Sequence, residues 1–218
     1  DKNQPNIFSD LSFSVKAGDA LALLGRNGVG KSTLLSCLMC FNHVQQGHIY
    51  CSGVDLMTAS IKERAKLIAF VPQIIGADIA YTVRDYISFG ATLRTGMFSS
   101  PGKEEFEKTD SIMDMLGITA LKDKPCRDLS GGQRQLVADQ LRAQGYAIIF
   151  TTHLPEQALL LNSRVGLCRG GTIDFYNSVS DVTLEALEEI YKTKLSLFYS
   201  DTVNRTVCVI PQLGQKGM

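Results

Sequence analysis

The stretch ALALLGRNGVGKSTLLSCLMC, residues 20–40, joins an apolar run, a glycine-rich loop and the start of an apolar helix. Residues 20–25 are continuously apolar, which is typical of a strand that is buried on both faces of a sheet. Residues 25–32 fit the pattern of glycine, four residues, then Gly-Lys-Ser, which phosphate-binding loops share. A strand, a loop and a helix in this order predict an α/β fold with a parallel sheet and an anion site where the helix begins.

The residue types of this loop suit a nucleoside triphosphate. Glycines let successive backbone N–H groups converge on phosphate oxygens, where larger side chains would collide, and the helix dipole favours the same anion. Lys31 is placed to reach the β- and γ-phosphates, and the Ser32 hydroxyl to ligate Mg²⁺. We therefore predict an ATP and Mg²⁺ site formed by Gly25, Asn27, Gly28, Gly30, Lys31, Ser32 and Thr33.

A second motif, LSGGQRQ at residues 129–135, restricts the family, because GTPases, kinases, motors and transport ATPases all carry phosphate loops. It resembles the signature of ATP-binding cassette (ABC) ATPases. The resemblance implies that two copies of the chain form a head-to-tail dimer with two ATP molecules between them. In that dimer the signature closes on the γ-phosphate held by the other copy, and the residues implied are Ser130, Gly131, Gly132 and Gln133.

Two shorter motifs follow the order of the same family. FVPQ ends at Gln73, and this position resembles the glutamine loop, which touches Mg²⁺ and the attacking water and senses the membrane subunit. TTH ends at His153 after an apolar run, and this position resembles the histidine switch, which contacts the γ-phosphate. A glutamine or histidine alone is usually a surface or structural residue, but the order of the motifs favours a role in catalysis for both.

The resemblance implies the organisation of the whole chain. The fold expected is a P-loop NTPase core of the ABC ATPase type, with a parallel sheet and an antiparallel β subdomain. Residues 1–75 and 128–218 would form this core with its C-terminal tail, and residues 76–127 an inserted α-helical subdomain. The stretch from YTVRDYISFG to the signature is similar to importers of iron–siderophore complexes, haem, cobalamin and, in some members, molybdate. The partners implied are transmembrane permease subunits at the cytoplasmic face of the membrane and, indirectly, a substrate-binding protein.

Composition separates this interpretation from alternatives. The chain has 22 basic and 22 acidic residues, and a net charge of zero argues against a nucleic-acid-binding protein. A soluble ABC ATPase acting on nucleic acid or the ribosome remains an alternative, although the chain lacks the long coiled coils or tandem cassettes that such proteins tend to carry. Cys37 and Cys40 have no second cysteine pair or paired histidines nearby, so we expect small core residues rather than zinc ligands.

Two parts that the family requires are absent from these 218 residues. The Walker B aspartate and the catalytic glutamate should lie between Ser130 and His153, but 22 residues are too few for a helix, a strand, a loop and a crossover helix. We expect the intact protein to carry a further segment near Val137–Asp139; otherwise the chain is a non-hydrolysing, degenerate cassette. The aromatic residue that stacks on adenine is also expected upstream of the sequence, since Phe8 suits the core better.

Overall fold

The computed structural model describes residues 7–70, 82–92, 102–125, 128–129, 131–202 and 205–209. The chain divides into two compact units. The first unit comprises residues 1–32 and 141–218, and the second comprises residues 33–140. The predicted helical subdomain, residues 76–127, lies within the second unit, and its bounds remain a prediction.

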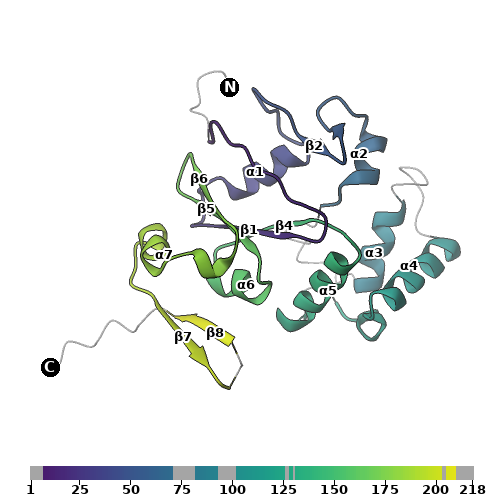
Figure 1. Ribbon diagram of the computed structural model, residues 1–218. Coiled ribbons are helices and arrows are strands. Elements are labelled where there is room, and N and C mark those ends of the chain that lie inside the picture. Colours follow the sequence, from purple (N-terminus) through teal and green to yellow (C-terminus); the bar gives the residue numbers. More distant parts are fainter. Residues whose placement is uncertain are drawn as a thin grey trace. The chain divides into compact units, whose positions relative to one another are not determined.

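The first unit is built on a four-stranded sheet (Figure 1). Its strands lie in the order β4 (Ile148–Thr152), β1 (Ala20–Leu24), β5 (Arg164–Cys168) and β6 (Ile173–Tyr176). β1 runs parallel to both β4 and β5, as the apolar run at residues 20–25 predicts. β5 and β6 form an antiparallel hairpin, and its turn contains Gly170 and Gly171, both with positive φ.

One face of this sheet carries the apolar core of the first unit. Helices α6 (Pro155–Leu160) and α7 (Leu184–Tyr191) and the hairpin of β7 (Ser196–Ser200) and β8 (Arg205–Val209) contribute to the first unit, with a 3-10 turn at Val179–Asp181. Thr183 caps α7 by accepting a hydrogen bond from the backbone N–H of Ala186. The buried residues of this core are Ala22, Leu24, Ala158, Val165, Leu167, Val182, Ala186, Leu187, Ile190, Leu195 and Cys208.

Two expectations about strands differ from the structure. The alternation of apolar and polar side chains over residues 11–17 predicts a half-buried strand, but these residues form no strand, although residues 11–16 do alternate between half-buried and exposed. Side-chain alternation fixes only which face is buried, whereas a strand also needs a backbone partner. The apolar run before His153 predicts a buried strand and does form β4, but four of the five residues of β4 are half-buried. β4 is the end strand of the described sheet, so one of its edges has no neighbour there.

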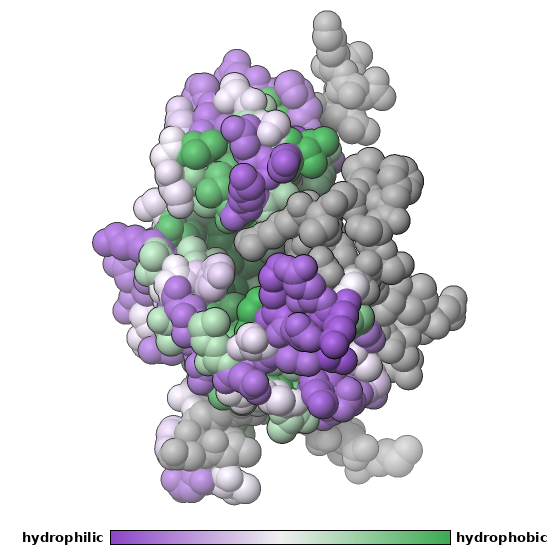
Figure 2. All heavy atoms as spheres, turned by 90° about the vertical axis from the view of Figure 1, so that its right-hand side faces the viewer, coloured by the Kyte–Doolittle hydropathy of each residue, from purple (hydrophilic) through white to green (hydrophobic). Residues whose placement is uncertain are grey.

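The second unit contains short elements and a helical pair. Its hairpin, β2 (Tyr50–Cys51) and β3 (Val54–Asp55), is followed by α2 (Ile61–Leu67), which begins with a capping box between Ser60 and Glu63. Large apolar side chains are exposed on this unit, among them Phe41, Tyr50 and Ile61. Figure 2 likewise shows apolar areas among hydrophilic residues on the face it draws.

Helices α3 (Val83–Thr92) and α4 (Lys103–Met115) pack against each other, and the 3-10 turn Thr119–Leu121 follows them. Arg84 of α3 forms two hydrogen bonds, of 2.7 and 2.5 Å, with the carboxylate of Asp110 on α4, and lies over the ring of Phe106. The buried hydroxyls of Ser88 and Thr109 are 3.1 Å apart. These contacts hold the two helices as one body, in agreement with the helical character that the sequence predicts for this region.

Two helices follow the motifs that decide the family. α1 (Lys31–Leu38) begins at the lysine of the phosphate loop, and α5 (Gly131–Ala143) begins within the signature. The expected junction at Val137–Asp139 lies inside α5, which runs without a break and is joined to β4 by only four residues. No helix in the described part of the chain has the length and apolar character that crossing a bilayer requires.

Candidate functional site

The phosphate-binding loop begins where β1 ends. All five residues of β1 are buried, as is Gly25, whereas Arg26, Asn27 and Gly28 are exposed. Ser32 and Thr33 lie in the first turn of α1, and the Ser32 residue is exposed. The loop is thus fixed at both ends by regular structure and open to solvent in its middle, at the N-terminus of a helix.

Lys31 folds back over the loop that precedes it. Its ammonium donates hydrogen bonds to the backbone carbonyls of Gly25, at 2.7 Å, and Arg26, at 2.8 Å. The residue is 8% exposed. Burial lowers the pKa of Lys31, and the nearby Cys168 opposes this shift. The side chain therefore spans the loop, with two of the three ammonium donors directed at its carbonyl groups.

Two glycines of the loop are required for different reasons. Gly28 has a φ of +82° and Gly30 a φ of +103°, which L-residues with a side chain rarely adopt. A Cβ at Gly30 would lie 2.3 Å from Cγ2 of Ile7 and 2.9 Å from Cε2 of Phe8, so the N-terminal segment excludes any side chain there. A Cβ at Gly28 would meet no atom within 4 Å. Gly28 is therefore needed for its backbone conformation alone, on the open side of the loop.

His153 lies at the same edge of the sheet as the phosphate loop. The parallel strands β1 and β4 are in register, and Leu24 is paired with Thr152. Gly25 and His153 each follow the last paired residue, so both lie beyond the carboxyl ends of adjacent strands. The buried Thr152 hydroxyl accepts a hydrogen bond of 2.9 Å from the N–H of Leu154, which fixes the turn that carries His153. The structure thus brings together two motifs that lie more than 120 residues apart.

The structure describes only some of the other predicted site residues. Gln73 and Ser130 lie outside the described residues, so their predicted roles remain predictions. Gly131 and Gly132 form the first residues of α5. The side-chain oxygen of Gln133 accepts a hydrogen bond of 2.7 Å from Lys124, within the second unit. The predicted contact of the signature with a nucleotide on another copy is likewise untested.

The sequence motifs do not place three residues that lie near the loop. A Cβ at Gly25 would lie 3.1 Å from the Cβ of Cys168, so this cysteine at the end of β5 packs tightly beneath the loop. Burial raises the pKa of the Cys168 thiol to about 11, which keeps it neutral at physiological pH. Ile7 and Phe8 lie against Gly30, as described above. These side chains are far from the loop in sequence, and only the fold brings them close to it.

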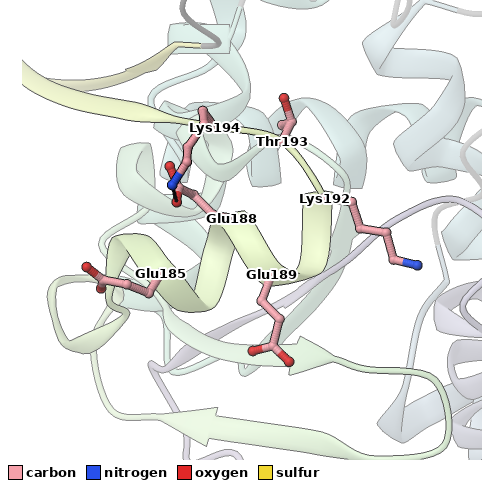
Figure 3. A pocket seen from close by; sticks show the side chains of 6 residues that line it. All are labelled: Glu185, Glu188, Glu189, Lys192, Thr193 and Lys194. Atoms are coloured by element: carbon pink, nitrogen blue, oxygen red, sulfur yellow. Dashed lines mark hydrogen bonds and ion pairs between the residues drawn. The ribbon is translucent and has the colours of Figure 1, made fainter.

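A separate surface depression lies on α7 and the turn after it (Figure 3). Its lining is charged, and the ammonium of Lys194 lies 2.9 Å from the carboxylate of Glu188. Glu189 is paired with Arg169, the residue after the end of β5. These ion pairs are typical of a solvated helix face. None of the lining residues belongs to the phosphate loop or to the other predicted motifs, so we assign no binding role to this depression.

Comparison with known proteins agrees with the geometry of the loop. The family model described as "ABC transporter" matches residues 8–138. The chain belongs to the ABC transporter family. A putative metal-chelate type ABC transporter, captured in an inward-facing conformation, has a similar structure, with a TM-score of 0.66 and 25% identity over 93% of this chain and 91% of that chain. The predicted fold class, a P-loop core of the ABC ATPase type, is confirmed.

Two curated ABC relatives are similar in sequence. A probable iron chelatin transport ATP-binding protein of Helicobacter pylori is 34% identical over 136 positions, which cover 62% of this chain and 53% of that protein. A molybdate import ATP-binding protein of Haemophilus influenzae is 27% identical over 219 positions, covering 85% of this chain and 81% of that protein. The chain thus spans about half the length of the Helicobacter pylori relative. These relatives agree with the importer group that the sequence resembles.

Proposed function

We propose that this chain is the ATP-binding and ATP-hydrolysing subunit of an ABC importer that takes up a metal chelate. The observation that carries the proposal is the phosphate loop between β1 and α1, with His153 at the same sheet edge. The cargo class is supported by the iron chelatin and molybdate transport names of the two relatives and by the metal-chelate transporter of similar structure. Because the cargo of an importer is selected by other subunits, this class is inferred from similarity alone.

The described loop fits a nucleotide's phosphates. Gly28 has no atom within 4 Å of a Cβ position, which leaves its backbone open to an incoming group. Lys31 holds two loop carbonyls and has a third ammonium proton for a phosphate oxygen. The N-terminus of α1 favours the same negative charge. Asn27, Gly30 and Thr33 would complete the contacts of ATP, and His153 would approach its γ-phosphate from β4.

Mg²⁺ would be held by few protein ligands. Ser32 is exposed in the first turn of α1 and supplies a hydroxyl oxygen, a ligand type that Mg²⁺ accepts. Gln73 would supply an amide oxygen. The described residues contain no group of three or more His, Cys, Asp or Glu side chains that could hold a metal. The ion would therefore be bound chiefly with the phosphates, and it would neutralise charge that develops during phosphoryl transfer.

The proposed assembly is the one that the resemblance to ABC ATPases implies. A second copy of the chain would place Ser130, Gly131, Gly132 and Gln133 on the nucleotide, and transmembrane permease subunits would receive the closure of the dimer at the cytoplasmic face of the membrane. A substrate-binding protein would deliver the chelate to the permease. Gln73 and the helical pair α3–α4 would transmit the state of the nucleotide to the permease.

The absence of an intervening strand between α5 and β4 supports a second candidate, a cassette that binds ATP without hydrolysing it. The four-residue connection between Ala143 and Ile148 leaves no place for the aspartate and glutamate that the family uses. An intact mass near 23.8 kDa for the natural protein, together with ATP binding without phosphate release, would support this candidate. Steady-state hydrolysis by the same chain would contradict it.

Replacement of Lys31 by alanine tests the proposed nucleotide site. A lysine–phosphate hydrogen bond contributes about 1.5–3 kcal/mol, so Lys31→Ala should weaken ATP binding at least tenfold, as measured by calorimetry. Lys62→Ala, on the exposed face of α2, is the matched control and should bind as the unmodified chain does. In the assembled transporter Lys31→Ala should also abolish ATP hydrolysis. Unchanged ATP affinity and activity in Lys31→Ala would refute the assignment.

A further inference from the structure

Two cysteines lie at the carboxyl end of α1, the helix that begins at the phosphate loop (Figure 1). α1 ends at Leu38, and Cys37 and Cys40 lie on either side of this end. The sequence predicts small core residues at both positions, but the structure leaves both only half-buried. Their thiols are therefore within reach of a small reagent in the folded chain.

A Schellman motif ends α1 and brings the two cysteines together. The N–H of Phe41 donates a hydrogen bond of 2.8 Å to the carbonyl of Ser36, and the N–H of Cys40 donates one of 2.9 Å to the carbonyl of Cys37. Residues that close a turn with such a bond have Cα atoms less than about 7 Å apart. Disulfides join Cα atoms that are about 4.4–6.8 Å apart. The turn thus holds the two cysteines at a separation that a disulfide can span.

Cys40 occupies a position where glycine is the usual residue. The φ of Cys40 is +54°, the left-handed conformation that follows the helix end in a Schellman motif. A side chain destabilises this conformation, because its Cβ crowds the following carbonyl oxygen. The thiol of Cys40 lies 3.4 Å from the carbonyl of Leu56, and a thiol is only a weak donor. This contact does little to offset the strain, and strained positions cluster at functional sites.

The two thiols are close enough to affect each other. Burial raises the pKa of Cys37, and the neighbouring Cys40 raises it further. The described residues contain no group of three or more His, Cys, Asp or Glu side chains that could hold a metal, so the pair lacks the additional ligands of a zinc site. The chemistry open to two adjacent thiols is to bond to each other or to share one partner atom.

We propose that Cys37 and Cys40 form a redox-active dithiol, which a low-molecular-weight disulfide such as oxidised glutathione converts to an intramolecular disulfide. The Cys40 thiolate attacks one sulfur of the oxidant, whose S–S bond breaks and releases one glutathione. The Cys37 thiolate then attacks Sγ of Cys40 and releases the second glutathione. The two thiol protons pass through water to the two glutathione thiolates, so two thiols are oxidised and one disulfide is reduced.

The order of the two attacks follows from the surroundings of the thiols. Because the thiolate is the nucleophile, the raised pKa of Cys37 makes this thiol the less ready to attack first. In a reducing compartment, the pair would stay a dithiol until the thiol pool becomes oxidised, as redox-sensing cysteines do. The new bond would close the last turn of the helix that carries Lys31 and Ser32 at its start. This modification goes beyond the proposed function and does not depend on it.

The first test treats the chain with oxidised glutathione and counts free thiols after denaturation. Cys51 and Cys126 are replaced by alanine, so that Cys168 and Cys208, which are buried, are the only thiols besides the pair. This test chain should lose two thiols and the mass of two hydrogens, and dithiothreitol should restore both. A test chain that keeps all of its thiols would overturn the proposal.

Single substitutions in the test chain identify the bond. Cys40→Gly removes the thiol and relieves the left-handed strain, so the chain should stay folded and form no disulfide. Cys37→Ala should stop the reaction at the mixed disulfide, with one glutathione attached to Cys40. Cys51→Ala alone is the matched control, because Cys51 is also half-buried, and it should still form the disulfide. Loss of two thiols in Cys37→Ala or Cys40→Gly would show that Cys168 and Cys208 react instead, and would overturn the proposal.

A trivalent arsenical tests the separation of the thiols without a redox step. Phenylarsine oxide binds two thiols when both can reach its arsenic atom, and a second tethered thiol strengthens binding by about 100-fold or more. The test chain should therefore bind one equivalent, and Cys37→Ala and Cys40→Gly should each bind at least about 100-fold more weakly. Equal affinity in the three chains would mean that the two thiols cannot share one atom, and would overturn the proposal.

Discussion

β1 and β4 are adjacent five-residue strands in register, and their apolar sequences predict the same buried environment, yet their surroundings differ. Leu21 of β1 is 1% exposed, whereas its register partner Ile149 is half-buried. The difference arises from the neighbours: β1 lies between two strands, and β4 has one among the described residues. The comparison teaches that an apolar run predicts the tendency to be buried, whereas the fold determines how far burial proceeds.

The largest expected effect tests this comparison with two alanine substitutions. Leu21→Ala removes a fully buried side chain and should lower the free energy of unfolding by about 2–5 kcal/mol. Ile149→Ala removes a half-buried side chain from the paired position and should cost less than half as much, because less apolar surface returns to water. Denaturant titration of both variants measures the two values. Equal losses would mean that β4 is as well covered as β1.

Local sequence predicts some features of the site, whereas other features depend on the tertiary fold. The predicted roles of Gly28, Gly30 and Lys31 follow from a local motif, because the chemistry of a phosphate loop lies in consecutive residues. The packing of Cys168 under Gly25 depends on the register of β5 with β1, which no local pattern contains. The strand predicted at residues 11–17 failed for a related reason, since its side-chain alternation is present but its backbone partner is not among the described strands.

The position of His153 was predicted from motif order, and the structure supplies the reason for it. Parallel strands end at one edge of a sheet, and the pairing of Leu24 with Thr152 puts the residues after them level with each other. The sequence could identify β1 and β4 separately as strands. It could name them as neighbours only through the family resemblance, because pairing between distant strands is a property of the tertiary fold.

The two glycines of the loop give the next comparison, with an intermediate effect. Gly30→Ala adds a Cβ at 2.3 Å from Ile7 to a backbone with positive φ, so strain and steric overlap add to about 2–4 kcal/mol of destabilisation. Gly28→Ala has the backbone strain alone, about 1–2 kcal/mol. Thermal unfolding of both variants tests the difference. If Gly28→Ala were the more destabilising of the two, the packing of the N-terminal segment on Gly30 would be wrong.

The smallest expected effect concerns Cys168, on the strand that flanks β1 opposite β4. Burial raises the pKa of its thiol from 9.0 to about 11 in the folded chain. A raised pKa of an acid means that the unfolded chain ionises first as the pH increases, so the contribution to stability is complete below pH 9 and is lost between pH 9 and about 11. Two pKa units correspond to about 2–3 kcal/mol at most.

The unfolding free energy of the unmodified chain should therefore fall between pH 9 and about pH 11 by more than that of Cys168→Ala, measured by urea titration at several pH values. Parallel pH profiles for the two chains would show that Cys168 is not buried beneath the loop. Its position would then be as open as that of β4, and the difference between the two sides of β1 would disappear.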